Sequence, residues 1–135
     1  MRAVRSEGWF RLAFVLHTGI VITVASLAYS GHLHLPRLFA SPYDLLGHAV
    51  LIGLMGALLD GALGFRPLTR WTPRWLGLGP SIIVALAGVE EILQVLSANR
   101  SSSLSDFLAD VTGVVVLCTV VRILRARRSA GDPSK

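Results

Sequence analysis

The chain has 135 residues, of which 53% are hydrophobic and 16% are charged, whereas an average soluble protein is about 25% charged. The formal net charge is +5, but the basic residues lie at the ends of long apolar segments, as orientation in a membrane requires. Nucleic acid is therefore excluded as a favoured partner. The single cysteine, Cys118, cannot form an intrachain disulfide and lies within an apolar segment, so we interpret it as a packing residue.

Four apolar segments follow one another along the chain. They cover residues 12–29, 45–63, 76–96 and 107–124. At about 1.5 Å per residue, each is long enough to cross a hydrocarbon core of about 30 Å. Backbone polar groups have no partner in lipid, so each segment should be an α-helix. We predict an all-α integral membrane bundle of four transmembrane helices in one domain, residues 1–124, followed by a basic, disordered tail, residues 125–135.

The first apolar segment could instead belong to a cleaved signal peptide, because Arg2, Arg5 and Arg11 precede it. Its apolar run is longer than the ~7–15 residues of such a peptide. We therefore expect a retained helix. Its His17 should be a hydrogen-bonded packing residue.

Lysine and arginine are distributed unequally between the two ends of the predicted helices. Eleven of the 13 lie in the N-terminus, in the 64–75 loop or in the tail, and only Arg37 and Arg100 lie in the other two loops. Because basic residues stay in the cytoplasm, we predict an N-in/C-in topology with the 30–44 and 97–105 loops facing outward. The protein should be a multi-pass protein of the cell (inner, cytoplasmic) membrane.

The second segment begins with a recognisable helix start. Ser41 is placed as N-cap, Pro42 as N1 and Asp44 as N3 in capping-box spacing. His48 follows Asp44 at i+4 and so lies on the same face, one turn deeper. In the preceding loop, His32 and His34 have no nearby carboxylate or cysteine, which favours a solvated loop over a metal site.

Small residues repeat every four positions along the second segment: Ala49, Gly53, Ala57 and Gly61. Such a stripe lets another helix approach closely, and it could serve packing within the chain or a homo-oligomer equally well. Asp60 lies near the inner end of this segment, where we expect it to turn toward Arg66 or Arg70.

Polar residues mark the junction of the third and fourth segments. Glu91 shares a face with small residues and should point at another helix, and Gln94 lies at i+3, close enough to join it. Glu90 points about 100° away, toward the interface or Arg100. Asp106 is placed at the start of the fourth helix, whereas Asp110, one turn deeper, is too far inside for capping.

The predicted topology brings polar residues from three helices to one depth in the outer leaflet. The cluster consists of Asp44, His48, Glu91, Gln94, Arg100, Asp106 and Asp110. Intramembrane charge is costly and often marks a functional site. One interpretation is a polar clamp that holds the bundle together. The other is a clamp that also serves as a ligand-binding or catalytic site.

These residues resemble the signature of the VanZ-like family of small bacterial membrane proteins. That signature has Asp-Lys-x-x-His opening one helix, then Glu-x-x-Gln, then Arg-x-x-Ser-x-x-Asp, and then Asn and Gly. The corresponding residues here are Asp44 to His48, Glu91 to Gln94, Arg100 to Asp106, Asp110 and Gly113. The resemblance covers roughly residues 40 to 115. It implies a protein of the cell envelope and a link to resistance against the glycopeptide teicoplanin.

Two positions depart from the family pattern. Leu45 stands where the family has Lys, and Asp110 stands where it has Asn. Each change makes the cluster one charge more negative, and close carboxylates in a poorly solvated place cannot all ionise cheaply. Our hypothesis is that at least one carboxylate is protonated or that a cation occupies the site.

Three functions compete at this stage. The first is a membrane protein that binds or modifies a lipid-linked or cationic envelope component. The second is an outer-leaflet enzyme in which His48, oriented by Asp44, acts as acid or base with Glu91 or Asp106 as a second acid or metal ligand. The third is a proton-coupled transporter acting as an oligomer. The spacing identifies no metal-ligand motif and we predict no cofactor; the lipid bilayer is the partner that the composition implies.

Overall fold

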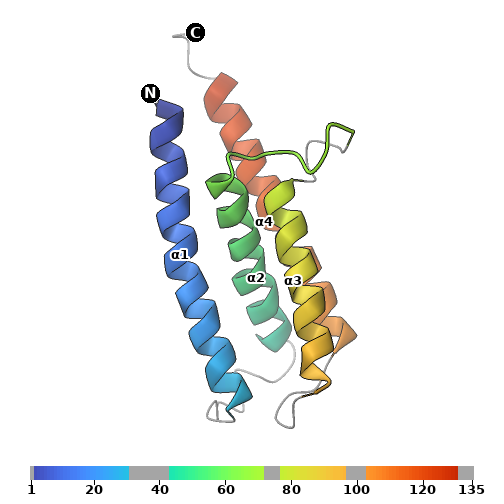
Figure 1. The fold of residues 1–135 in the computed structure, drawn as a ribbon. Coiled ribbons are helices and arrows are strands. Elements are labelled where there is room, and N and C mark those ends of the chain that lie inside the picture. Colours follow the sequence, from blue (N-terminus) through green and yellow to red (C-terminus); the bar gives the residue numbers. More distant parts are fainter. Residues whose placement is uncertain (1, 31–42, 72–76, 97–102, 131–135) are drawn as a thin grey trace.

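Four antiparallel helices form an up-and-down bundle (Figure 1). The computed structural model describes residues 2–30, 43–71, 77–96 and 103–130. The helices are α1 (Arg2–Tyr29), α2 (Tyr43–Ala62), α3 (Leu78–Gln94) and α4 (Leu104–Ala130). The prediction of an all-α fold is confirmed. We call the end at which α2 and α4 begin the polar end, and the opposite end, at which α1 begins and α4 ends, the arginine end.

Three of the helices are long and apolar enough to cross a membrane by length and composition: Glu7–Tyr29 within α1, α2 and α4. Large apolar side chains are exposed along the bundle, for example Leu16 at 62% and Ile92 at 68%. A water-soluble bundle would bury such side chains, whereas lipid solvates them. These features indicate a membrane protein in contact with a lipid bilayer. α3 is shorter, with 17 residues, and is not among these three candidate spans.

Two helices extend beyond the predicted segments at the arginine end. α1 begins at Arg2 instead of Leu12, and α4 continues to Ala130 through six residues that we expected to be disordered. Arginine and alanine are good helix formers, so the helix can continue beyond the apolar segment. The Arg125 guanidinium also lies 4.3 Å from the centre of the Phe65 ring, which ties the extension to the loop after α2.

α2 is the centre of the bundle because it packs against all three other helices. Its most extensive contact is with α4, where Gly53 lies directly against Gly113. A methyl group built on Gly113 would overlap the Ala49 carbonyl oxygen. Gly61 lies instead against Phe10 of α1. The small-residue stripe is therefore occupied within the chain, and a homo-oligomer built on it finds no support.

The middle of the bundle is apolar. Its most buried side chains are Ala57 of α2, Ile83 of α3, and Val114 and Cys118 of α4. Cys118 is thus a packing residue, as predicted. His17 is also a packing residue, since it is buried between α1 and α2 with Nε2 2.9 Å from the Leu51 carbonyl oxygen.

Asp60 forms a buried ion pair with Arg122, not with Arg66 or Arg70 as the sequence suggested. Its carboxylate accepts from Nε of Arg122 at 2.7 Å and from Nη2 at 2.8 Å. Asp60 is completely buried, while Arg66 and Arg70 are exposed. The i+3 relation of Asp60 to Ala57 turns Asp60 toward α4, so the α4 arginine is its partner. Gly77 leaves room for the pair, because a methyl group there would overlap the guanidinium.

The glycine contact predicts opposite effects for two glycine-to-alanine substitutions. Gly113→Ala should destabilise the protein by about 1–3 kcal/mol, because its methyl group forces α2 and α4 apart. Gly19→Ala should be neutral or stabilising by up to about 1 kcal/mol, because nothing lies within 4 Å of the new methyl group. Unfolding curves in detergent check this. Equal effects of the two substitutions would contradict the close contact.

The buried ion pair predicts that Arg122→Met destabilises the protein by about 3–5 kcal/mol, because Asp60 is left charged and uncompensated. The double variant Asp60→Leu/Arg122→Met should recover most of that loss. The control is Arg66→Met at an exposed position. Unfolding in detergent is again the measurement. If Arg66→Met destabilises the protein as much as Arg122→Met does, Asp60 is paired with Arg66, as the sequence suggested.

Candidate functional site

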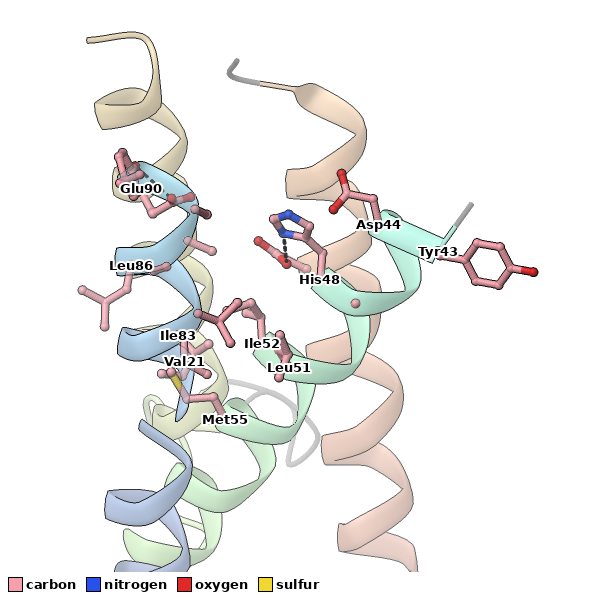
Figure 2. Close-up of a pocket in the computed structure, with 17 residues that line it drawn as sticks. Val21, Tyr43, Asp44, His48, Leu51, Ile52, Met55, Ile83, Leu86 and Glu90 are labelled. Carbon is pink, nitrogen blue, oxygen red and sulfur yellow. Dashed lines mark hydrogen bonds and ion pairs between the residues drawn. The ribbon is translucent and has the colours of Figure 1, made fainter. Parts of the chain in front are cut away.

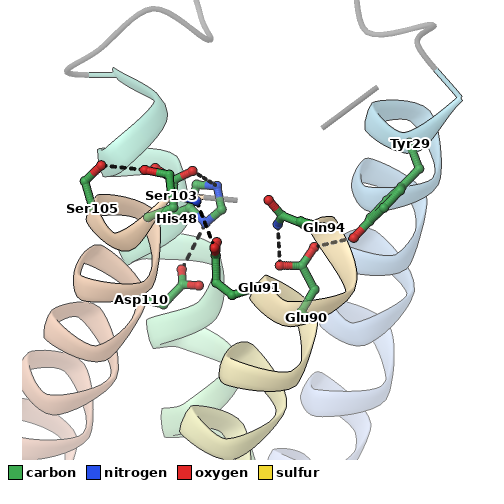
Figure 3. Close-up of polar contacts among 9 residues, drawn as sticks. Tyr29, His48, Glu90, Glu91, Gln94, Ser103, Ser105 and Asp110 are labelled. Atoms are coloured by element: carbon green, nitrogen blue, oxygen red, sulfur yellow. Dashed lines mark hydrogen bonds and ion pairs between the residues drawn. The ribbon is translucent and has the colours of Figure 1, made fainter. Parts of the chain in front are cut away.

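Five of the eight acidic residues of the chain gather at the polar end: Asp44, Glu90, Glu91, Asp106 and Asp110. They come from α2, α3 and α4, which places the ends of three helices around one volume (Figure 3). The antiparallel order produces this arrangement, because the starts of α2 and α4 meet the end of α3.

His48 is the centre of the contacts between α2 and α4. Its Nδ1 atom lies 3.1 Å from Oδ1 of Asp110, and its Nε2 atom lies 4.0 Å from Oδ2 of Asp106. Asp106 and Asp110 are one helical turn apart and both face α2. One imidazole therefore links two turns of the neighbouring helix.

The Asp110 contact determines how the imidazole is used. Asp110 is 3% exposed, and its carboxylate accepts the Nδ1–H of His48. In the neutral imidazole this leaves the Nε2 lone pair directed to the side of Asp106. We expected Asp44 to orient the imidazole, but the hydrogen bond is formed by Asp110. Asp44 remains close, with a carboxylate oxygen within 4.8 Å of ligand atoms of both His48 and Asp106.

A second group of contacts connects α1 and α3. The Tyr29 hydroxyl donates to Oε1 of Glu90 at 3.0 Å, and the amide of Gln94 donates to Oε2 of the same residue. We predicted that Gln94 would join Glu91 at i−3, but it joins Glu90 at i−4. Both spacings are close on a helix, and the side-chain directions here favour the longer one.

Glu91 connects α3 to the start of α4. Its Oε2 atom accepts the backbone N–H of Ser103 at 2.9 Å, and Ser103 directly precedes the first residue of α4. A carboxylate at a helix N-terminus is stabilised by unpaired N–H groups and by the helix dipole. This contact favours a clamp role for Glu91.

An apolar pocket of about 470 Å³ opens between α1, α2 and α3 beside the polar cluster (Figure 2). Asp44, His48 and Glu90 line one end, and side chains such as Ile52 and Met55 line the rest. The pocket exists because α1 packs on α2 alone among the described helices, so α1 and α3 are separated. The hydrogen bond of Tyr29 to Glu90 bridges this separation at the polar end.

The structure thus brings together Asp44, His48, Asp106 and Asp110, and places Glu91 and Gln94 in neighbouring contacts. Arg100 and Ser41, the predicted N-cap residue, lie outside the described residues. The sequence did not identify the pairing of Tyr29 with Glu90, because Glu90 was expected to point toward the interface or Arg100. The signal for their pairing was the angle between Glu90 and Glu91, which turns Glu90 toward a different helix.

Comparison of the chain with protein-family models, with curated proteins and with solved structures gives no match. The resemblance to the VanZ-like family therefore depends on the quoted motifs alone.

Substitutions of Asp110 test the hydrogen bond to His48. Asp110→Asn should leave stability unchanged or increased, because the amide oxygen can still accept from Nδ1 and one charge is removed. Asp110→Leu should cost about 1–3 kcal/mol, because it leaves the imidazole donor unpaired. Thermal unfolding in detergent distinguishes the two. An unfolded Asp110→Asn protein would refute the view that the cluster carries excess negative charge.

Proposed function

We propose that the chain is a VanZ-like, four-span protein of the bacterial cytoplasmic membrane that binds a lipid-linked envelope component bearing an amine. The lipid chain would lie in the pocket between α1, α2 and α3. The amine would lie at the polar end, facing the outer leaflet. The observation that carries this proposal is the pocket itself, which is apolar along its length and acidic at one end.

The shape of the pocket fits an amphiphile better than a soluble metabolite. A volume of about 470 Å³ is within the usual range of about 300–1,000 Å³ for ligand pockets. Its walls are the facing surfaces of α1 and α3, which do not pack on each other, so a lipid chain can enter from the bilayer without leaving an apolar environment. The exposed apolar residues around the bundle support the same route.

The chemistry of the polar end favours a cationic head group. Asp44 and Glu90 line the pocket with carboxylates, and His48 and Tyr29 add hydrogen-bonding groups. A primary amine is a compact donor of three hydrogen bonds that suits such acceptors. An anionic head group would meet like charge there.

Topology supports an outward position for this site. Arg66, Arg70, Arg127 and Arg128 are exposed at the arginine end, and the positive-inside rule places that end in the cytoplasm. For α3 to be the fourth span, its 17 residues give about 26 Å. That length is a few ångström short of an average hydrocarbon core, a mismatch that thinning of the bilayer accommodates.

A second candidate, an outer-leaflet enzyme, is favoured by one observation. His48 is held by the buried Asp110, which resembles the orientation of a general base by a carboxylate. Proton-coupled transport has less support. The apolar layer of Ala57, Ile83 and Val114 separates the polar cluster from Asp60, and Asp60 is held by Arg122.

Binding of a lipid chain in the pocket is tested by placing a larger side chain there. Ala28 lines the pocket, whereas Ser26 on the same helix is exposed outside it. In detergent, a fluorescent single-chain lipid with a primary-amine head should bind the Ala28→Phe variant at least about tenfold more weakly than wild type, since a phenyl ring takes up the chain site. Ser26→Phe should bind as wild type.

The same assay tests the head group. A matched lipid with a hydroxyl in place of the amine should bind wild type more weakly, and Glu90→Gln should reduce the difference between the two lipids. If Ala28→Phe and Ser26→Phe bind the amine lipid equally, the pocket is not the binding site. If the two lipids bind wild type equally, the amine is not recognised.

A further inference from the structure

We propose that Asp44, His48 and Asp106 form a binding site for a divalent transition-metal ion, and that Zn²⁺ is the ion whose chemistry they fit. This site lies between α2 and α4, and two of its residues, Asp44 and His48, also line the polar end of the pocket. The sequence suggested only that a cation could occupy the polar cluster, whereas this site has three named ligands and a class of metal.

The distances between the three side chains are close to those of a zinc site. Each of the three residues offers one ligand atom, and these atoms all lie within 4.8 Å of one another; Nε2 of His48 and Oδ2 of Asp106 are 4.0 Å apart. Ligands at about 2.0–2.2 Å from a tetrahedral zinc ion are about 3.4 Å apart. Side-chain rotations that move each ligand atom by less than about one ångström would therefore bring the three atoms to zinc-binding distances, and no helix would have to move.

The second step is the orientation of His48. Asp110 accepts the Nδ1–H of the imidazole at 3.1 Å and is itself buried. A metal-bound histidine usually donates its other ring N–H to a carboxylate, which fixes the tautomer and makes the ligating nitrogen more basic. Asp110 thus serves as a positioning residue, and Nε2 is left on the side where the Asp44 and Asp106 carboxylates lie.

Gln94 provides an independent observation. Its side chain is completely buried, and its Oε1 atom has no hydrogen-bond partner in the described part of the structure. In Figure 3 the amide nitrogen of Gln94 faces Glu90, and its oxygen faces the side on which His48 lies. A buried acceptor without a donor is costly, and a water molecule bound to a metal ion is a hydrogen-bond donor.

The types of ligand select the class of metal. Calcium and magnesium prefer sets of oxygen ligands, whereas an imidazole with two carboxylates suits zinc and its first-row neighbours. Three protein ligands leave one position open in tetrahedral geometry. The positive charge also offsets two carboxylates that α2 and α4 bring into a poorly solvated place.

Metal binding is measured on the full chain, purified in detergent without an affinity tag and stripped with a chelator. Titration calorimetry should show one Zn²⁺ per wild-type chain. His48→Gln and Asp106→Asn should weaken binding at least about 100-fold, and Asp110→Asn about 10–100-fold, as expected for an outer-shell partner. Titration with Co²⁺ should give the visible absorption of a four-coordinate ion in wild type and not in His48→Gln.

Two controls separate this site from other binding. Glu7→Gln, at the arginine end, and the double variant His32→Gln/His34→Gln should bind Zn²⁺ as wild type. Asp44→Asn changes a half-buried position, so it tests the site even if His48→Gln fails to fold. Folding of every variant is monitored by its helical content in circular dichroism. The proposal is refuted if wild type binds no Zn²⁺, if folded Asp44→Asn and Asp106→Asn bind like wild type, or if the loop histidines account for the binding.

Discussion

The close approach of α2 and α4 is the constraint on which the rest of the structure depends. Gly53 and Gly113 bring the two backbones into contact, and buried polar side chains lie on either side of that contact. Toward the polar end, His48 reaches Asp106 and Asp110. Toward the arginine end, Arg122 reaches Asp60. Larger residues at the contact would separate the helices, and both polar groups would lose their partners together.

The same packing explains where the pocket lies. Since α2 uses its smallest residues against α4 and still packs on α1 and α3, those two helices lie on either side of it without packing on each other. Their separation becomes an apolar pocket, bounded at the polar end by the hydrogen bond of Tyr29 to Glu90. α2 and α4 thus form a closely packed pair, whereas α1 and α3 are separated. The polar cluster lies where both pairs meet the polar end.

Helix positions could be predicted from the sequence to within a few residues at the polar end, because apolar length and capping residues are local signals. The clustering of Asp44, His48, Asp106 and Asp110 followed from the i+4 spacings and an antiparallel order. The partners of Asp60 and Gln94 could not be predicted. The partner of Asp60 depends on the rotation of α2 against α4, which is determined by side-chain packing. The partner of Gln94 depends on the choice between the i−3 and i−4 side chains within α3. The helical extension to Ala130 was missed because the polar sequence carries no hydrophobic pattern.

The two groups of buried acids differ in a way that bears on function. At the arginine end, one carboxylate meets one guanidinium in a bidentate pair. Charge and hydrogen bonds are matched there, which is the mark of a structural contact. At the polar end, one imidazole is shared between Asp106 and Asp110, with Asp44 beside them. The His48 group therefore contains three carboxylates and one imidazole. Glu91, bound to the start of α4, belongs to the clamp. The His48 group, by contrast, has the acceptor-rich composition that attracts an amine or a metal ion.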